Sequence, residues 1–278
     1  MFAPLSIALA GTESLFEAGA EGFRPALAWA GSTGFAAVHL SAMMPGMRPR
    51  ELSRSARRDV AAALKRAGVG CSGVDLWIPA AHFGDHAHMD RAAAAASDAI
   101  EFAADVRTLM GEGGANASTS AIPSVCLTLG TACAPAVRAA LAARADTCGV
   151  RIADCTYPFG SGEVGLTSGG ETASGAGDSG LVRGGPIGVG LDPAAVLLAG
   201  GNPLKLVSTL GGRLACARLS DATSVERVGA GSGQLRVFEY AVGLATGGWP
   251  GCVVTDVRGT RDLRGAAAQA VEAWKVPA

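Results

Sequence analysis

Charged side chains stand at the ends of several short apolar runs in this sequence of 278 residues. Asp154, Asp192 and Asp256 are the carboxylates at such positions, and Arg218 stands at a similar one. Carboxylates transfer protons and bind divalent cations, whereas a guanidinium stabilises negative charge. Carboxylates brought close together repel one another, so a cation must lie between them. Either a divalent metal ion or Arg218 could supply that charge.

Polar and aromatic residues suited to holding a small molecule occur at or near the same kind of position. These further candidates are His39, Asp75, Trp77, His82 and Arg258. Their side chains offer hydrogen bonds, an aromatic face and positive charge, which together can bind a hydroxyl-rich or anionic ligand.

Structural interpretations compete with the chemical ones at several positions. A single Asp after a strand is usually a helix N-cap, and Asp192 followed by Pro193 fits that role by itself. The pair His86 and His88 has a spacing that could bind a metal ion, but a solvated loop explains it as well. The glycine-rich segment 229–233 could hold a phosphate with its backbone N–H groups, or could simply form a tight turn.

The elements that must position these residues are eight apolar runs alternating with helix-like or turn-rich stretches. The runs are Leu5–Leu9, Ala36–Leu40, Ser72–Leu76, Pro123–Leu127, Val150–Asp154, Ile187–Leu191, Arg213–Leu219 and Cys252–Asp256. Strands that alternate with helices form a parallel sheet, and eight such units in about 250 residues close a (β/α)8 TIM barrel. In that fold the chemistry takes place at the C-terminal ends of the strands. The pattern therefore predicts an α/β protein whose site lies at one mouth of a barrel.

One segment interrupts the alternation. Residues 160–185 contain ten glycines in twenty-six residues where the fifth barrel helix is expected. We interpret the segment as a flexible Gly/Ser-rich insertion that replaces much of that helix. The remaining units account for residues 1–278 as a single domain.

Composition excludes several classes of function. A net charge of -1 gives no electrostatic signature of nucleic-acid binding. The seven cysteines form no Cys-x-x-Cys pair, which favours a reducing compartment. No apolar run reaches the ~18 residues of a membrane span. We therefore expect a cytoplasmic protein that binds neither nucleic acid nor membrane; an oligomer remains an open alternative.

Most of the chain, and most clearly the segment 188–259, resembles the sugar phosphate isomerase/epimerase family of xylose isomerase-like TIM barrels. Gly190-Leu-Asp-Pro is similar to the family's strand-six Asp segment, and Arg218-Leu-Ser-Asp221 stands where members carry His-x-x-Asp. The glycine turn after it, residues 228–235, is similar as well. The run Gly248-Trp-Pro-Gly into Asp256 resembles the approach to the last strand, which ends in Glu in the family.

The resemblance implies a metal site with an altered ligand set. Family members hold one divalent ion with Glu, Asp, His and Glu from strands five to eight. The matching residues here are Asp154, Asp192, Arg218 and Asp256. Asp154, Asp192 and Asp256 are thus the implied ligands, with Arg218 in place of the histidine. Because arginine has no lone pair to give a metal, two alternatives follow: one ion (Mn, Mg, Zn or Co), or no metal and a guanidinium in its place.

The resemblance also implies an isomerase of carbohydrate metabolism. An isomerase or epimerase of this kind moves a proton next to a carbonyl of a sugar or sugar phosphate. Asp154 and Asp256 would be the base and the acid. The substrate would be held by His39, Asp75, Trp77, His82, Arg218 and Arg258. The alternative is a catalytically silent barrel that binds a sugar or a partner, since the ligand set is altered. An endonuclease-IV-type repair enzyme is excluded by the four histidines and the balanced charge.

Overall fold

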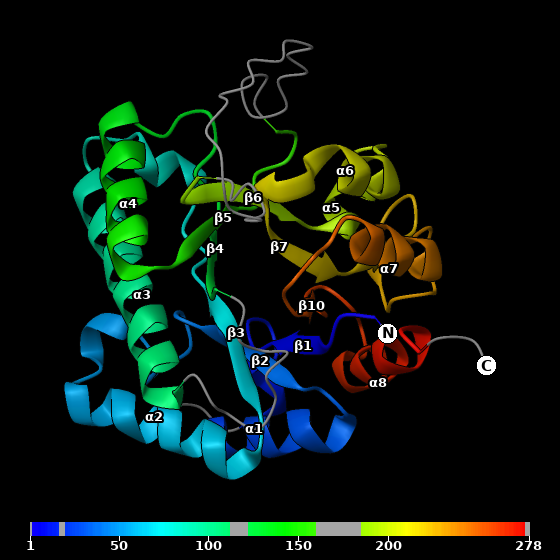
Figure 1. Ribbon diagram of the computed structural model, residues 1–278, viewed down its shortest axis with the longest axis horizontal. Coiled ribbons are helices and arrows are strands. Elements are labelled where there is room, and N and C mark those ends of the chain that lie inside the picture. Colours follow the sequence, from blue (N-terminus) through cyan, green and yellow to red (C-terminus); the bar gives the residue numbers. More distant parts are fainter. Residues whose placement is uncertain (1, 17–19, 112–121, 160–184, 276–278) are drawn as a thin grey trace, which may run out of the picture.

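Eight parallel strands close into a barrel in the computed structural model, which describes residues 2–16, 20–111, 122–159 and 185–275 (Figure 1). The barrel strands are β1 (Leu5–Ala8), β2 (Ala37–Ser41), β3 (Gly70–Asp75), β4 (Ser124–Leu127), β5 (Arg151–Asp154), β6 (Ile187–Leu191), β7 (Leu214–Leu219) and β10 (Val253–Thr255). Their order around the barrel is β1-β10-β7-β6-β5-β4-β3-β2, and β2 pairs with β1 to close it. This confirms the fold class predicted from the apolar runs.

Helices surround the barrel on its outer side (Figure 1). They are α1 (Ala20–Thr33), α2 (Arg54–Ala67), α3 (Met89–Met110), α4 (Pro135–Cys148), α5 (Pro193–Leu198), α6 (Pro203–Leu210), α7 (Val237–Thr246) and α8 (Leu263–Ala273). Apart from Gly185, the predicted glycine-rich insertion lies outside the described residues. Among the helices that are described, none is long and apolar enough to cross a membrane.

Local sequence signals explain where individual helices begin and end. Ser53 caps α2 by accepting a hydrogen bond from the Ala56 amide, and Gly68 ends the helix in the left-handed conformation, at φ 68°. The Asp192 carboxylate accepts from the Ala195 amide at the start of α5, immediately before Pro193. The N-cap role that its sequence position suggested is therefore present.

A short antiparallel ribbon follows β7 on the mouth side of the barrel. It consists of β8 (Asp221–Ala222) and β9 (Arg227–Val228). Because the ribbon folds back after the end of β7, it returns Arg227 to the mouth.

Small side chains fill part of the barrel interior and leave room for polar ones. One buried cluster inside the barrel consists of Ala8, Cys126, Ala153, Ala215, Cys216 and Val254. Arg218 and Asp256 follow Cys216 and Val254 by two residues, and side chains two apart point to the same face of a strand. A large arginine therefore enters a space that leucine or isoleucine would otherwise fill.

Gly73 allows β3 to approach its neighbours closely. A Cβ at this position would lie 2.1 Å from the Ser124 carbonyl oxygen and 2.5 Å from Cε1 of His39. Its φ of 152° is also one that side-chain-bearing residues rarely adopt. Any side chain here would push against β4 and displace His39.

We expect Gly73→Ala to lower the free energy of unfolding by about 2–3 kcal/mol, because it overpacks the barrel wall. The matched control is Gly68→Ala, which also needs a positive φ but has no atom within 4 Å of the new Cβ. That control should cost only about 1 kcal/mol, the strain of the left-handed conformation. Urea unfolding of both variants measures the difference, and equal losses would show that the close contacts of Gly73 are not limiting.

Candidate active site

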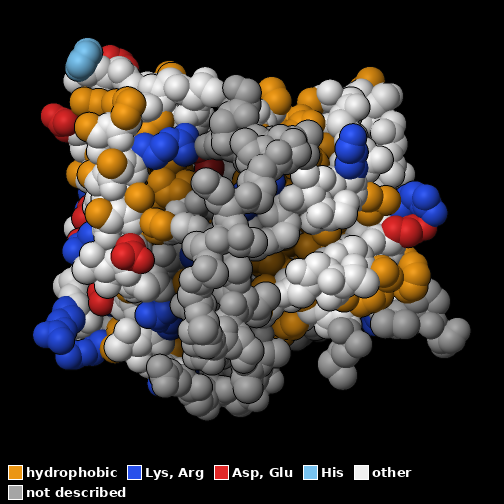
Figure 2. Space-filling model, turned by 45° about the horizontal axis from the view of Figure 1, so that its top comes forward, with side chains coloured by type: hydrophobic (Ala, Val, Ile, Leu, Met, Phe, Trp, Pro, Cys, Tyr) orange, Lys and Arg blue, Asp and Glu red, His pale blue; other side chains and the backbone are white. Residues whose placement is uncertain are grey.

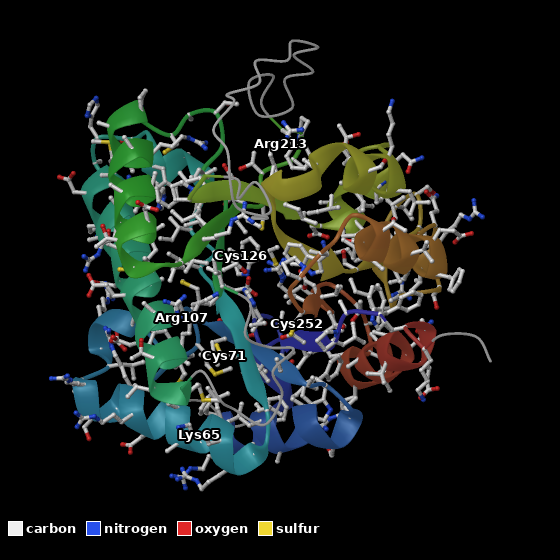
Figure 3. The ribbon with its side chains drawn as sticks, viewed as in Figure 1. Lys65, Cys71, Arg107, Cys126, Arg213 and Cys252 are labelled. Atoms are coloured by element: carbon white, nitrogen blue, oxygen red, sulfur yellow. The ribbon has the colours of Figure 1, made fainter. Side chains whose placement is uncertain are left out.

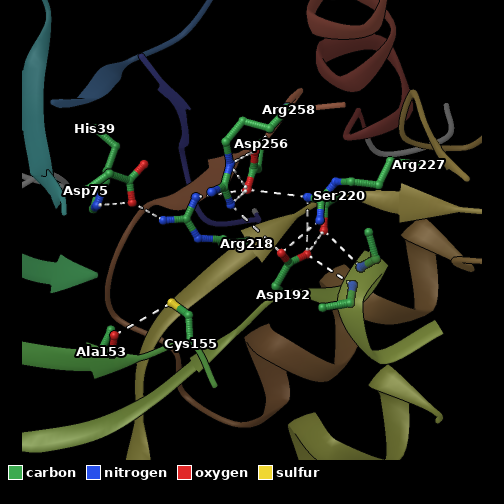
Figure 4. Close-up of polar contacts among 12 residues, drawn as sticks. His39, Asp75, Ala153, Cys155, Asp192, Arg218, Ser220, Arg227, Asp256 and Arg258 are labelled. Atoms are coloured by element: carbon green, nitrogen blue, oxygen red, sulfur yellow. Dashed lines mark hydrogen bonds and ion pairs between the residues drawn. The ribbon is translucent and has the colours of Figure 1, made fainter. Parts of the chain in front are cut away.

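A buried ion network centred on Arg218 occupies the barrel where the strands end (Figure 4). The Arg218 side chain is 0% exposed, and its guanidinium donates to Asp75 and, at 3.1 Å, to Oδ2 of Asp256. His39 continues the row, with Nε2 3.5 Å from Oδ1 of Asp75. The sequence offered Arg218 as one of two possible sources of positive charge among the mouth carboxylates, and its contact with Asp256 shows that it supplies such a charge.

The two carboxylates bound to Arg218 differ in basicity. Burial raises the pKa of Asp75, and the nearby charges of Arg218 and His39 only partly oppose that rise. Burial would raise the pKa of Asp256 too, but Arg258, Arg218 and Arg227 hold it well below its usual range. Asp256 is therefore ionised and a weak base, whereas Asp75 is the easier of the two to protonate.

A second layer of charges lies closer to the solvent. Nε of Arg258 donates to Oδ1 of Asp256 at 2.9 Å, and Nη2 of Arg227 lies 3.4 Å from Oδ2 of the same carboxylate. Arg227 also donates from Nη1 to Oδ2 of Asp192 at 3.0 Å. The Arg258 guanidinium lies 3.9 Å from the centre of the Trp77 ring, a distance at which cation–π attraction is favourable. Asp192 and Asp256 are thus linked by arginines, as Figure 4 shows.

A cavity of about 370 Å³ opens at this mouth. Its lining consists of Trp77, Thr128, Cys155, Asp192, Arg227, Arg258 and Gly259. Asp192 is the carboxylate among these lining residues. The cavity therefore presents one carboxylate, two guanidinium groups and an aromatic ring to a ligand.

The four positions carried over from the family do not fit a divalent ion. Asp154 accepts from Arg138 Nη2 at 3.2 Å and from the Thr156 hydroxyl at 2.6 Å. Asp192 is held by the Ser220 hydroxyl at 2.6 Å and by Arg227. Arg218 has no lone pair to give, and the Asp256 carboxylate is already surrounded by guanidinium groups. At the mouth of this barrel, the positive charge among the carboxylates is supplied by arginine.

Other candidates from the sequence lie away from the cavity lining. His82 is in the short 3-10 helix Ala80–Phe83, and its ring stacks on His88 with centroids 4.4 Å apart. His88 in turn contacts the Asp85 carboxylate at 2.5 Å. A substrate-binding role for His82 stays a prediction.

The glycine-rich loop after β9 is organised by an internal carboxylate. Asp221 accepts from the amides of Gly231 at 3.0 Å, Gly233 at 2.8 Å and Leu235 at 2.8 Å. Backbone N–H groups of the kind that bind phosphate are therefore already satisfied by a side chain of the same chain. The tight-turn interpretation of this segment is the one that the contacts favour.

Arg227 is the site residue that sequence reasoning missed. It lies in the ribbon after β7 and not at the end of a barrel strand, so the strand-end criterion could not select it. Its only sequence signal is its place nine residues after Arg218 within a segment rich in turn residues.

No protein-family model matches the chain, and no curated protein matches it in sequence. Solved structures do match over nearly the whole length. D-psicose 3-epimerase from Clostridium cellulolyticum H10, solved with D-tagatose, gives a TM-score of 0.68 at 15% identity, covering 98% of both chains. A xylose isomerase domain protein from Planctomyces limnophilus gives 0.66 at 14% identity, covering 98% of this chain and 94% of that one. A 3-keto-D-glucoside 4-epimerase from E. coli gives 0.64 at 11% identity, covering 97% of each. These similarities establish a xylose isomerase-like TIM-barrel fold.

We expect Arg218→Met to lower the free energy of unfolding at pH 7 by about 3–5 kcal/mol, because it leaves the Asp75 carboxylate buried without its cation. The loss should shrink as the pH falls from 7 to 5. A carboxyl whose pKa is raised in the folded state takes up a proton there, and protonation removes the uncompensated charge. Asp256 keeps Arg258 and Arg227 and should contribute little to this trend.

The control is Arg261→Met, which removes an 88% exposed arginine paired with Glu226. It should change stability by less than about 1 kcal/mol at either pH. Chemical denaturation at both pH values supplies the comparison. A loss in Arg218→Met that is the same at pH 5 as at pH 7 would contradict the assignment of the cost to Asp75.

Proposed function

We propose that the protein is a sugar isomerase/epimerase-like enzyme that acts on an anionic sugar, such as a sugar phosphate, in the cavity at the barrel mouth. The observation that carries this proposal is the pair Arg227 and Arg258, which line the cavity beside Asp192 and Trp77. Guanidinium groups match the oxygens of phosphate and carboxylate groups, and an aromatic ring suits the apolar face of a sugar.

The arginines retain capacity to bind a ligand. Arg258 bonds to Asp256 through Nε and Nη2, and no bond from its Nη1 is found within the described part of the chain. Its side chain is 26% exposed and that of Arg227 is 19% exposed. Each is thus fixed in direction by a carboxylate while part of its guanidinium faces the cavity.

Asp192 is the group we assign to proton transfer. It is the carboxylate in the cavity lining, and its side chain is 11% exposed, against 5% for Asp154 and 0% for Asp256. The acid and base roles assigned to Asp154 and Asp256 by family resemblance remain predictions that this difference in exposure does not favour. Asp192 would remove a proton next to the carbonyl, and the neighbouring guanidinium groups would stabilise the enediolate oxygen.

A single carboxylate favours isomerisation over epimerisation. One base can take a proton from a carbon and return it to the adjacent carbon on the same face. When the hydroxyl proton of the enediolate also moves from one oxygen to the other, these two transfers interconvert an aldose and a ketose. Inversion at a single carbon needs proton delivery to the opposite face, and thus a second group. The geometry around Asp192 supports the first reaction.

A second function has its own supporting observation. The mouth carboxylates are each paired with an arginine: Asp192 with Arg227 at 3.0 Å, Asp154 with Arg138, and Asp256 with Arg218. A fully neutralised set of charges suits a barrel that binds an anionic sugar without transforming it. Proton exchange distinguishes the two functions because it reports the first chemical step alone.

We expect the protein to exchange deuterium from D₂O into ketose and aldose phosphates at the carbon next to the carbonyl, as followed by proton NMR. Asp192→Asn should lower the exchange rate at least ~100-fold, the scale of a general base. Asparagine is as good an N-cap as aspartate, so α5 should remain intact.

The matched control is Asp262→Asn, because Asp262 caps α8 in the same way but is not in the cavity lining. It should leave exchange unchanged. Calorimetric binding of a sugar phosphate without any exchange would establish the catalytically silent binder. Absence of both binding and exchange would overturn the proposal.

A further inference from the structure

Below the mouth, three side chains with metal-binding atoms converge inside the barrel. One ligand atom each from His39, Asp75 and Cys126 lies within 4.8 Å of the other two, and all three residues are buried. Figure 3 shows Cys126 in the middle of the barrel. We propose that His39, Asp75 and Cys126 form a buried site for Zn²⁺ or a similar borderline divalent ion, distinct from the arginine-filled mouth.

Unsatisfied polar atoms point to a missing ligand here. Nε2 of His39 and Oδ2 of Asp75 are both buried and have no hydrogen-bond partner among the described residues. Buried polar atoms are rarely left so, because each costs about 1–3 kcal/mol. Arg218 and His39 both approach Oδ1 of Asp75, so Oδ2 keeps its lone pairs for another group.

Hydrogen bonds around His39 set its tautomer for metal binding. Nδ1 lies 3.1 Å from the Ser72 hydroxyl, which also contacts the Ser6 hydroxyl at 2.7 Å and the Val38 carbonyl at 3.3 Å. In the tautomer with its proton on Nδ1, the ring donates to Ser72, Ser72 donates to one of these two oxygens, and Nε2 carries the lone pair that a metal ion needs. A second ring nitrogen bonded in this way is the usual arrangement of a histidine that ligates a metal. In that tautomer, Nε2 of His39 and Oδ1 of Asp75 are two electron-rich atoms 3.5 Å apart. A cation bound between them would remove the repulsion of their lone pairs.

Cys126 supplies the sulfur ligand of the proposed site. Its side chain is fully buried, and its sulfur lies within 4.8 Å of a ligand atom of His39 and of Asp75. Asp75 and Cys126 are also paired in register on the neighbouring strands β3 and β4. The thiolate is the form of cysteine that binds metals.

Charge and ligand type favour zinc over the harder cations. A thiolate, a carboxylate and a neutral imidazole together carry two negative charges, which match the charge of a divalent ion. Sulfur and nitrogen ligands select Zn²⁺, whereas Mg²⁺ and Ca²⁺ require oxygen ligands. Zinc held by three protein ligands takes a water molecule as its fourth ligand and holds the protein ligands at about 2.0–2.3 Å. Binding would therefore draw the three side chains together by on the order of 1 Å. As zinc binds, any proton on the Cys126 sulfur is released to solvent.

The test uses Co²⁺ and Zn²⁺ alone as probes of the intact, chelator-treated protein. We expect one Co²⁺ per chain, with a thiolate-to-cobalt charge-transfer band in the near ultraviolet and the strong visible bands of a tetrahedral site. Cys126→Ser should abolish the charge-transfer band and lower Zn²⁺ affinity at least tenfold. Cys252→Ser, at another buried cysteine shown in Figure 3, should change neither.

A measurement on the unmutated protein guards against a variant that does not fold. X-ray absorption at the zinc edge should show one sulfur at about 2.3 Å and nitrogen or oxygen neighbours at about 2.0 Å. No metal uptake by the folded wild type, a shell without sulfur, or a charge-transfer band that survives in folded Cys126→Ser would overturn the site. None of the three ligands lines the mouth cavity, so the outcome is independent of the proton-exchange experiment.

Discussion

Burial of the Arg218 guanidinium inside the barrel is the constraint on which the rest of the site depends. An ion at 0% exposure is tolerated only when opposite charges and hydrogen bonds replace the lost water. Asp75 and Asp256 supply those charges from β3 and from the end of β10, on opposite sides of the guanidinium. The Trp77 ring adds a favourable contact at 5.1 Å, and Tyr240 fixes the strand by donating its hydroxyl proton to the Arg218 carbonyl at 2.9 Å. The small interior residues of the barrel are also required, because they leave the volume that the Arg218 side chain fills.

From Arg218 outward, the charges alternate in sign until they reach the solvent. Asp256 forms ion pairs with Arg218, Arg258 and Arg227. Arg227 also forms an ion pair with Asp192 at the cavity. These ion pairs fix the positions of both carboxylates and connect the barrel interior to the mouth. On the outer face, by contrast, Lys and Arg side chains are scattered among Asp and Glu (Figure 2). The ordered alternation of charge described here is a feature of the barrel mouth.

The sequence predicted which charged residues lie at the barrel mouth, but not how they would pair. Apolar runs at regular spacing determine a (β/α)8 barrel, and parallel strands bring their C-terminal ends to one mouth. The placement of Asp154, Asp192, Arg218 and Asp256 at that end of the barrel therefore followed from chain order alone. Pairing depends on which side chain points inward and on how far it reaches. Asp154 accepts a hydrogen bond from Arg138, and Asp221 accepts hydrogen bonds from the loop amides. No local sequence pattern predicts either contact.

The grouping of His39, Asp75 and Cys126 depends on the register across three strands, in which Asp75 pairs with Cys126 and His39 with Gly73. Arg227 was missed because a short ribbon, and not a barrel strand, carries it to the mouth.

Replacing a mouth cation by guanidinium groups changes what the cavity can recognise. A divalent ion binds neutral hydroxyl and carbonyl oxygens through its open coordination positions. A guanidinium has one charge spread over a plane and only N–H donors, so it binds best to an oxyanion that accepts two parallel hydrogen bonds. Because Asp192 and Asp256 already balance Arg227 and Arg258, an anionic ligand would have to compete for the outward-facing donors of both arginines. Binding should therefore favour ligands with several anionic oxygens. The Trp77 ring, which lies 3.9 Å from the Arg258 guanidinium and lines the same cavity, would then orient the remainder of the molecule toward Asp192. In the proposed function, the arginines would therefore select the class of substrate, and the distance of a carbon from the Asp192 carboxylate would select the carbon that reacts.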